Sequence, residues 1–177
     1  MNLVRPATLA DLPVIHRLQN VPYRDLVFAH PLPPLQEFLS EGEERIKTMK
    51  QVDYIFEQDA VPMGFIEYQT EQESTSIWGK WLSTLVYVCG VLAFDDLKFS
   101  KLVWHVRASN KPMLRTCEKM KFRRTGEKNF ANITGGLAFV AFGKLTYFEI
   151  TAAEFNTNRG WMKDLALPVE IRFRDPS

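Results

Sequence analysis

Hydrophobic and polar positions along the chain change between helical and extended spacing, and this change predicts a mixed order of helices and strands. A short strand at residues 3–5 precedes a helical face that begins after Thr8 and Asp11, which are spaced as in a capping box. A second apolar helical face runs over residues 34–50. The segment between them, residues 21–34, holds four prolines and is predicted as a loop or broken helix.

The middle of the chain carries extended patterns and then a strongly apolar segment. Three strands are predicted at residues 54–57, 63–69 and 74–82, with Phe65 and Glu67 on one face of the second. Residues 85–97 are apolar nearly all round, which is typical of a helix buried on a sheet. Residues 85–88 fit a strand equally, because two of them are β-branched. The rest of the pattern predicts a strand at 101–107, a helix at 112–120, strands at 123–129 and 137–151, a short helix at 152–165 and an extended piece at 169–173.

Composition places the chain among ordinary globular proteins and excludes several function classes. The 177 residues fit one domain, 1–177, with 46% hydrophobic and 24% charged residues. Lys plus Arg number 22 against 21 for Asp plus Glu, so a nucleic-acid partner is not expected. The longest apolar run, residues 82–94, is too short to span a membrane. With two cysteines and no signal peptide, we expect a cytoplasmic protein without disulfides, and no spacing of ligand residues suggests a metal.

Residues 93–126, AFDDLKFSKLVWHVRASNKPMLRTCEKMKFRRTG, carry the most specific pattern of the chain. A helix ending in Ala-Phe, a strand, Asn110 opening a helix with Arg115, and Glu-Lys-Met-Lys-Phe before another strand resemble the second half of the GNAT acetyltransferase fold. The resemblance implies an α/β (α+β) fold. Its central sheet would be mixed, mostly antiparallel and twisted, with six to seven strands and helices on both faces. The strand at 101–107 would lie parallel to the strand at 74–82 and be splayed from it.

The same resemblance implies acetyl-coenzyme A as cosubstrate, which transfers its acetyl group to a primary amine by direct attack in a ternary complex. In the family, an Asn at the place of Asn110 meets the pantetheine arm, and Arg115 belongs to the same motif; a plain helix N-cap is the alternative for Asn110. Cys117 stands where the family often has a Tyr that protonates the departing thiolate. A small buried helix residue is the alternative for Cys117.

The chain departs from the family between the third strand and the long helix. Family members usually carry a glycine-rich loop there, whose amides bind the cofactor pyrophosphate. The corresponding residues here are Gly79-Lys-Trp81-Leu82-Ser83-Thr84, with one glycine. We expect coenzyme A near the backbone of Trp81 and Leu82, with the Ser83 and Thr84 hydroxyls and Lys80 as further donors. The alternative is a GNAT-like protein that no longer catalyses and serves as a binding or structural module.

Two residues are candidates for the base that takes the proton of the amine. Glu67 lies in a strand among apolar residues, where an unpaired carboxylate is costly; a solvated or paired sheet residue is the alternative. His105 lies on the strand before Asn110, and a satisfied sheet-face histidine is its alternative.

The C-terminal part of the pattern, residues 147–155, resembles the branch of ribosomal-protein alanine and amino-sugar acetyltransferases. The acceptor is then a protein N-terminus, an amino sugar or a small amine. Its specificity is expected to lie in residues 21–34, and the protein to be a monomer or homodimer.

Overall fold

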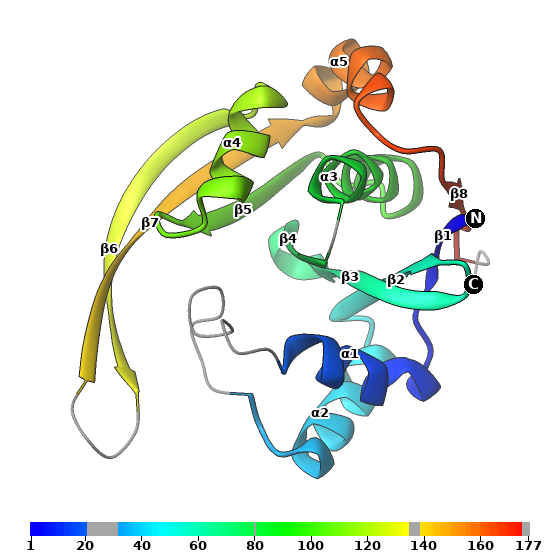
Figure 1. Cartoon of the computed structure of the whole chain (residues 1–177), viewed down its shortest axis with the longest axis vertical. Helices are drawn as coiled ribbons and strands as arrows, with labels where there is room; N and C mark the ends of the chain where they lie inside the picture. The colour runs from blue at the N-terminus through cyan, green and yellow to red at the C-terminus, as the bar shows by residue number, and fades with distance from the viewer. Residues whose placement is uncertain (21–31, 80, 135–138, 175–177) are drawn as a thin grey trace.

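One mixed sheet organises the described residues of the computed structural model, which are 1–20, 32–79, 81–134 and 139–174. Its eight strands lie in the order β6-β7-β5-β4-β3-β2-β1-β8 (Figure 1). The strands are β1 (Asn2–Pro6), β2 (Gln51–Gln58), β3 (Val61–Gln69), β4 (Ser74–Gly79), β5 (Lys101–Arg107), β6 (Arg123–Thr134), β7 (Phe139–Thr151) and β8 (Glu170–Ile171). The helical elements are η1 (Leu9–Asp11), α1 (Leu12–Gln19), α2 (Leu35–Lys47), η3 (Thr70–Gln72), α3 (Leu82–Val91), η4 (Leu92–Asp96), α4 (Lys111–Lys119) and α5 (Ala152–Asp164).

Helices cover both faces of this sheet (Figure 1). The larger core lies between the sheet and α3, α4 and α5, while α1 and α2 cover the other face. Strand alternation divides the side chains between the two: Ile66 and Tyr68 of β3 face α3, and Phe65 faces α1 and α2. The predicted α/β architecture with helices on both faces is confirmed. The sheet exceeds the expected six to seven strands because the C-terminal extended piece pairs with β1.

The predicted elements are present, with shifted ends. The ambiguous residues 85–88 are helical: α3 begins at Leu82 and is buried from Thr84 to its end, which agrees with its uniformly apolar sequence. It continues into η4, a π-helical turn. The third predicted strand stops at Gly79 instead of residue 82. β2 begins at Gln51, three residues before its predicted start. The prediction began later because Gln51 and Asp53 are polar, which is typical of a loop.

β4 and β5 form a parallel pair that meets at one register position, Ser74 opposite Val103. The Val103 amide donates to the carbonyl of Glu73 at 3.0 Å. Glu73 adopts a left-handed conformation (φ 46°), and its carboxylate accepts from the amide and hydroxyl of Ser100 at 2.8 and 2.9 Å. This clamp fixes the closed end of the pair, and no second register pair forms along the described strands. The splayed parallel pair predicted from the sequence is thereby confirmed.

The C-terminal segment after α5 returns across α3 to the edge of the sheet. The Leu167 amide donates to Oγ of Thr84 at 2.9 Å, and Asn2 donates its side-chain amide to the Pro168 carbonyl at 2.9 Å. β8 then pairs in parallel with β1, and the Arg172 amide donates to the Val4 carbonyl at 2.8 Å. Among the described helices, none is long and apolar enough to cross a membrane.

Two helical glycines provide a matched test of the core between α3 and α5. A Cβ added to Gly90 would lie 2.2 Å from the ring of Phe155, which is fully buried, whereas one added to Gly160 meets nothing within 4 Å. We expect Gly90→Ala to destabilise the protein by about 1–3 kcal/mol through overpacking. Gly160→Ala should stabilise it by about 1 kcal/mol, because alanine favours helix. Urea unfolding measures both, and equal shifts in the same direction would contradict this packing.

Candidate functional site

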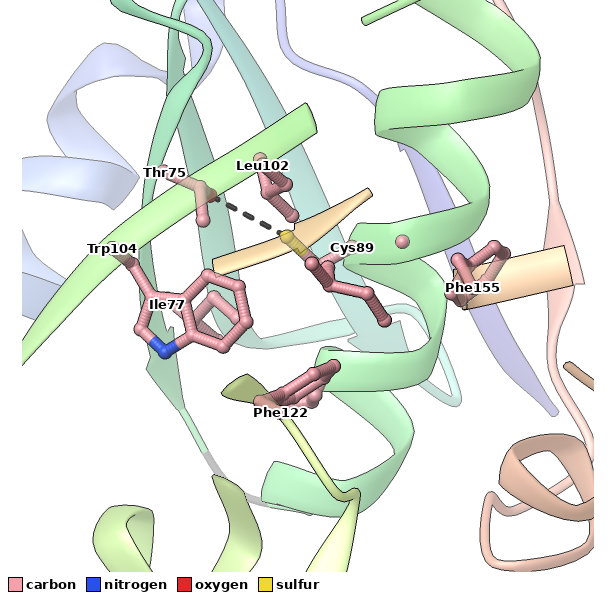
Figure 2. A pocket seen from close by; sticks show the side chains of 10 residues that line it. Thr75, Ile77, Cys89, Leu102, Trp104, Phe122 and Phe155 are labelled. Carbon is pink, nitrogen blue, oxygen red and sulfur yellow. Dashed lines mark hydrogen bonds between the residues drawn. The ribbon is translucent and has the colours of Figure 1, made fainter. Parts of the chain in front are cut away.

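The closed end of the β4–β5 pair is filled by core side chains. A cavity of about 10 Å³ remains beneath it, and Figure 2 shows several of the side chains around it, with the Cys89 thiol directed at the Thr75 hydroxyl at 3.4 Å. Such a space admits roughly one water molecule. A larger ligand between these strands therefore has to lie beyond Ile77 and Trp104, toward the open end. The lining residues are Thr75, Ile77, Val86, Cys89, Gly90, Leu102, Trp104, Phe122, Ile150 and Phe155.

The start of α3 lies at this open end, because it follows β4. Trp81 is its N-cap residue in a left-handed conformation (φ 62°, ψ 48°), with its side chain 46% exposed. A residue other than glycine costs about 1–2 kcal/mol in this left-handed conformation. Trp81 adopts it at the place where the resemblance implies a glycine-rich loop. Leu82 and Ser83 are partly buried, while Thr84 is buried with its hydroxyl accepting from Leu167. Ser83 is thus the more accessible of the two predicted hydroxyls.

The start of α4 lies at the same edge, because β5 runs parallel to β4. Asn110 caps α4, with its side-chain oxygen accepting from the Met113 amide at 3.2 Å, as the sequence predicts. The side-chain NH₂ group of Asn110 takes no part in this capping hydrogen bond. Arg115 is exposed on the next turn. Two helix N-termini therefore follow the open ends of two parallel strands, an arrangement that favours an anion.

Cys117 lies on the inner side of α4. It is fully buried, its sulfur accepts from the indole N–H of Trp104 at 3.4 Å, and burial raises the pKa of its thiol to about 11. This environment favours the alternative interpretation of Cys117 as a packed helix residue.

A pair of carboxylates lies on the sheet face beneath α1 and α2. Glu67 of β3 is opposite Asp53 of β2 in the antiparallel register. Gln51 donates to both carboxylate oxygens of Asp53 at 2.9 and 3.0 Å. Gln69 donates to Glu67 at 3.0 Å and to the side-chain oxygen Oε1 of Gln51 at 3.2 Å. Glu67 therefore has a hydrogen-bond partner within the sheet, which fits both the candidate base and the alternative of a paired sheet residue.

Burial changes the ionisation of this pair. It raises the pKa of Asp53 to about 7, with the charge of Glu67 as the second cause, and it raises the pKa of Glu67. Arg45 of α2 opposes both shifts through its charge. Asp53 is not among the candidates predicted from the sequence, because the predicted strand begins at residue 54. Its signal is an acidic residue between Val52 and Tyr54, both buried.

His105 shares this face of the sheet but lies on β5, so that β4 separates it from Glu67. Its ring is exposed and lies 5.8 Å from that of Tyr147. Partial desolvation lowers the pKa of His105, and the nearby charge of Arg107 lowers it further. The imidazole is therefore neutral at neutral pH.

Two earlier expectations fall on residues outside the described ranges. Most of the proline-rich segment, residues 21–31, and Lys80 lie there. Within the described ranges, no group of three or more His, Cys, Asp or Glu side chains could hold a metal ion.

Comparison with solved structures supports the architecture. A spermidine N-acetyltransferase from Vibrio cholerae in complex with CoA and spermine matches 88% of this chain and 98% of its own, with a TM-score of 0.74 and 15% identity. Mutant forms of the spermidine/spermine N-acetyltransferase from the same organism match 88% and 96%, with a TM-score of 0.72 and 15% identity. A dodecameric form in an intermediate state matches 90% and 98%, with a TM-score of 0.68 and 16% identity.

No protein-family profile matches the chain, and no curated protein sequence matches it. At 15–16% identity, the likeness to the solved structures concerns the fold alone. The chain has the fold of the GNAT N-acetyltransferases, as residues 93–126 predict.

Proposed function

We propose that this protein is an acyl-CoA-dependent N-acyltransferase, which transfers an acetyl group from acetyl-coenzyme A to a primary amine by direct attack in a ternary complex. The observation that carries the proposal is the parallel β4–β5 pair, clamped at Ser74 and Val103 and splayed beyond, with helices α3 and α4 starting at its open end. A solved protein with the same fold is named as a complex with CoA and spermine. That complex supports both the cosubstrate and an amine acceptor.

The residues at the open end suit the phosphates of coenzyme A. The cavity at the closed end does not suit its pantetheine arm. The partly buried Ser83 and the first free amides of α3 are suitable donors for the pyrophosphate. The backbone of Trp81 and Leu82, with Asn110 and the exposed Arg115, borders the same end. Because the cavity at the closed end is too small for a pantetheine arm, that arm would lie further out between the strands.

The chemistry needs one proton acceptor on the amine side. The amine nitrogen attacks the thioester carbon, the C–S bond breaks, and the amine proton passes to a base directly or through water. Glu67 is the stronger candidate, since its burial raises its proton affinity and it lies on the face opposite α3. His105 is neutral and on the same face, and is the second candidate. Cys117 would serve as acid toward the thiolate only if its buried thiol became accessible.

Two observations bear on which amine is the acceptor. The residues 147–155 favour the branch of ribosomal-protein alanine and amino-sugar acetyltransferases, whereas the names of the solved neighbours favour a small polyamine. Competing an alanine-terminated peptide, an amino sugar and spermidine in one assay decides between them.

The expected monomer or homodimer differs from the dodecameric form of one solved neighbour. Analytical sedimentation measures the oligomeric state.

The start of α3 favours a second candidate function, a GNAT-fold binding or structural module without catalysis. Trp81 stands in the left-handed position, and the Thr84 hydroxyl is used by Leu167. The Thr84 hydroxyl is therefore occupied within the protein, and Trp81 stands where the resemblance implies a glycine-rich loop.

Coenzyme A binding separates the two functions. If the protein is an acyltransferase, acetyl-coenzyme A at about 100 times its dissociation constant should add about 2.7 kcal/mol to the stability. For a chain of this length, that corresponds to a rise in Tm of about 5–10 °C. A thermal-shift assay with coenzyme A, acetyl-coenzyme A and adenosine triphosphate as control measures it. An unchanged Tm with coenzyme A would favour the non-catalytic module.

Ser83 is expected to contribute to the phosphate end of this site. Ser83→Ala should weaken coenzyme A binding about 10-fold to 100-fold, the equivalent of one hydrogen bond to a charged group. Added salt should weaken it further, because screening reduces phosphate attraction. Thr84→Ala should instead lower stability, because it leaves the Leu167 amide without its acceptor. Isothermal titration calorimetry and urea unfolding measure the two effects; salt-independent binding that survives Ser83→Ala contradicts the placement.

Asn110 combines a structural and a predicted binding role, and two substitutions separate them. Asn110→Ala removes the cap of α4 and should cost about 0.5–2 kcal/mol in stability while raising the KM for acetyl-coenzyme A. Asn110→Asp keeps a capping oxygen but removes the amide donors, so stability should persist while the KM still rises. Steady-state kinetics beside thermal unfolding measure this. If Asn110→Asp keeps the wild-type KM, Asn110 is a plain N-cap.

A further inference from the structure

We infer that Asp53 and Glu67 work as one coupled carboxyl pair, in which the charge of Asp53 raises the proton affinity of Glu67, the group that accepts the proton of the acceptor amine. The inference rests on the proposed acyltransferase function and adds to it a residue that the sequence pattern did not single out. Asp53 does not contact the reacting atoms in this assignment. It acts through Glu67.

The strand register holds the two carboxylates opposite each other. Directly opposed residues in an antiparallel pair have their Cβ atoms about 4.5–5.5 Å apart. The next pair on the same face is Ile55 opposite Phe65, and both side chains are buried against α1 and α2. Because a one-residue slip of either strand would turn its side chain away from α1 and α2 and place polar neighbours in the core beneath α3, this packing fixes the register that brings Asp53 to Glu67.

The surrounding hydrogen bonds orient both carboxylates without neutralising them. Gln51 and Gln69 are joined to one another and each donates to one member of the pair. Amide donors carry no charge, so they leave the repulsion between two carboxylates in place. A single proton taken up between the carboxyl groups relieves that repulsion, as in other closely spaced carboxyl pairs.

Charged side chains on this face include Arg5 of β1, which Asp11 and Glu57 hold, and Arg45 of α2. Arg45 of α2 acts on both carboxylates, and it also pairs with Glu41 at 3.6 Å. α1 presents the apolar side chains Leu12 and Ile15 to this face. In β4, the residue opposite Glu67 is the neutral Ser76. Burial first, and the like charge of Glu67 second, raise the pKa of Asp53 to about 7, and burial raises the pKa of Glu67.

This setting suits proton transfer from an amine. Above its upper titration step the pair holds no proton, and Glu67 can accept one as the N–H bond of the amine breaks, the N–C bond to the acetyl group forms, and the C–S bond of the thioester breaks to release the coenzyme A thiolate. The proton is then held by the pair until solvent takes it. A general base is most effective when its pKa lies near the pH at which the enzyme works.

The pH dependence of acetyl transfer tests the coupling. Asp53→Asn keeps the shape of the side chain and removes its charge, so Glu67 should lose its proton at lower pH. The acid limb of kcat/KM should shift down by about one pH unit or more. Glu67→Gln should lower kcat by about 10²–10⁴-fold. Asp164→Asn, an exposed substitution on α5, is the matched control and should leave the profile unchanged. An Asp53→Asn profile that superimposes on that of the wild type overturns the inference.

Unfolding measured against pH tests the same pair without any activity. A carboxyl group whose pKa is raised on folding stabilises the protein below its unfolded value near 4, and this contribution is lost as the pH rises through about 7. Asp53→Asn should therefore have a higher Tm than the wild type at pH 8, and the difference should shrink toward pH 4. A difference independent of pH overturns the coupling. The expected pH dependence in a protein that acetylates no amine keeps the pair and rejects the proposed function instead.

Discussion

The clamp between Glu73 and Ser100 is the constraint on which the candidate site depends. Parallel strands that pair along their whole length leave no space between them, and strands without any bond have no fixed angle. Here one backbone bond and one carboxylate join β4 to β5 at the end where both begin. The Ser100 amide, as the largest cause, holds the pKa of the Glu73 carboxyl below its usual value, so this acceptor stays charged in mildly acidic solution. Beyond the clamp the two strands pair with their outer neighbours β3 and β7, and the starts of α3 and α4 follow their open ends.

Much of the fold could be predicted because its signals are local. The N-cap at Asn110, the capping box at Thr8 and the alternation along β3 each depend on a few neighbouring residues, and the structure confirms them. The apolar helix α3 was predictable from its uniform hydrophobicity, although its first turn was not, since Trp81 has no local signal for a left-handed conformation.

The candidate site was less predictable because its parts meet across strands. Glu67 could be named from its apolar neighbours, but its partner Asp53 is fourteen positions away and meets it through the register (67 − 53 = 14). Likewise, the sequence predicts a free Thr84 hydroxyl at the start of a helix. In the structure this hydroxyl accepts a hydrogen bond from the amide of Leu167, 83 positions further along the chain. Long-range pairings of this kind follow from the complete topology and leave no pattern in a short window.

The two-residue strand β8 has a consequence for handling the protein. Without it, β1 would be the border of the sheet, with a row of unsatisfied backbone groups beside the buried Leu3 and Val4. Such open borders recruit other chains, and natural proteins cover or charge them. At the opposite border, residues 123–129 of β6 are all exposed and mostly polar or charged, which discourages stacking. β8 thus protects the β1 edge from pairing with other chains, so substitutions that disrupt residues 170–171 endanger solubility more than substitutions at residues 123–129 of β6.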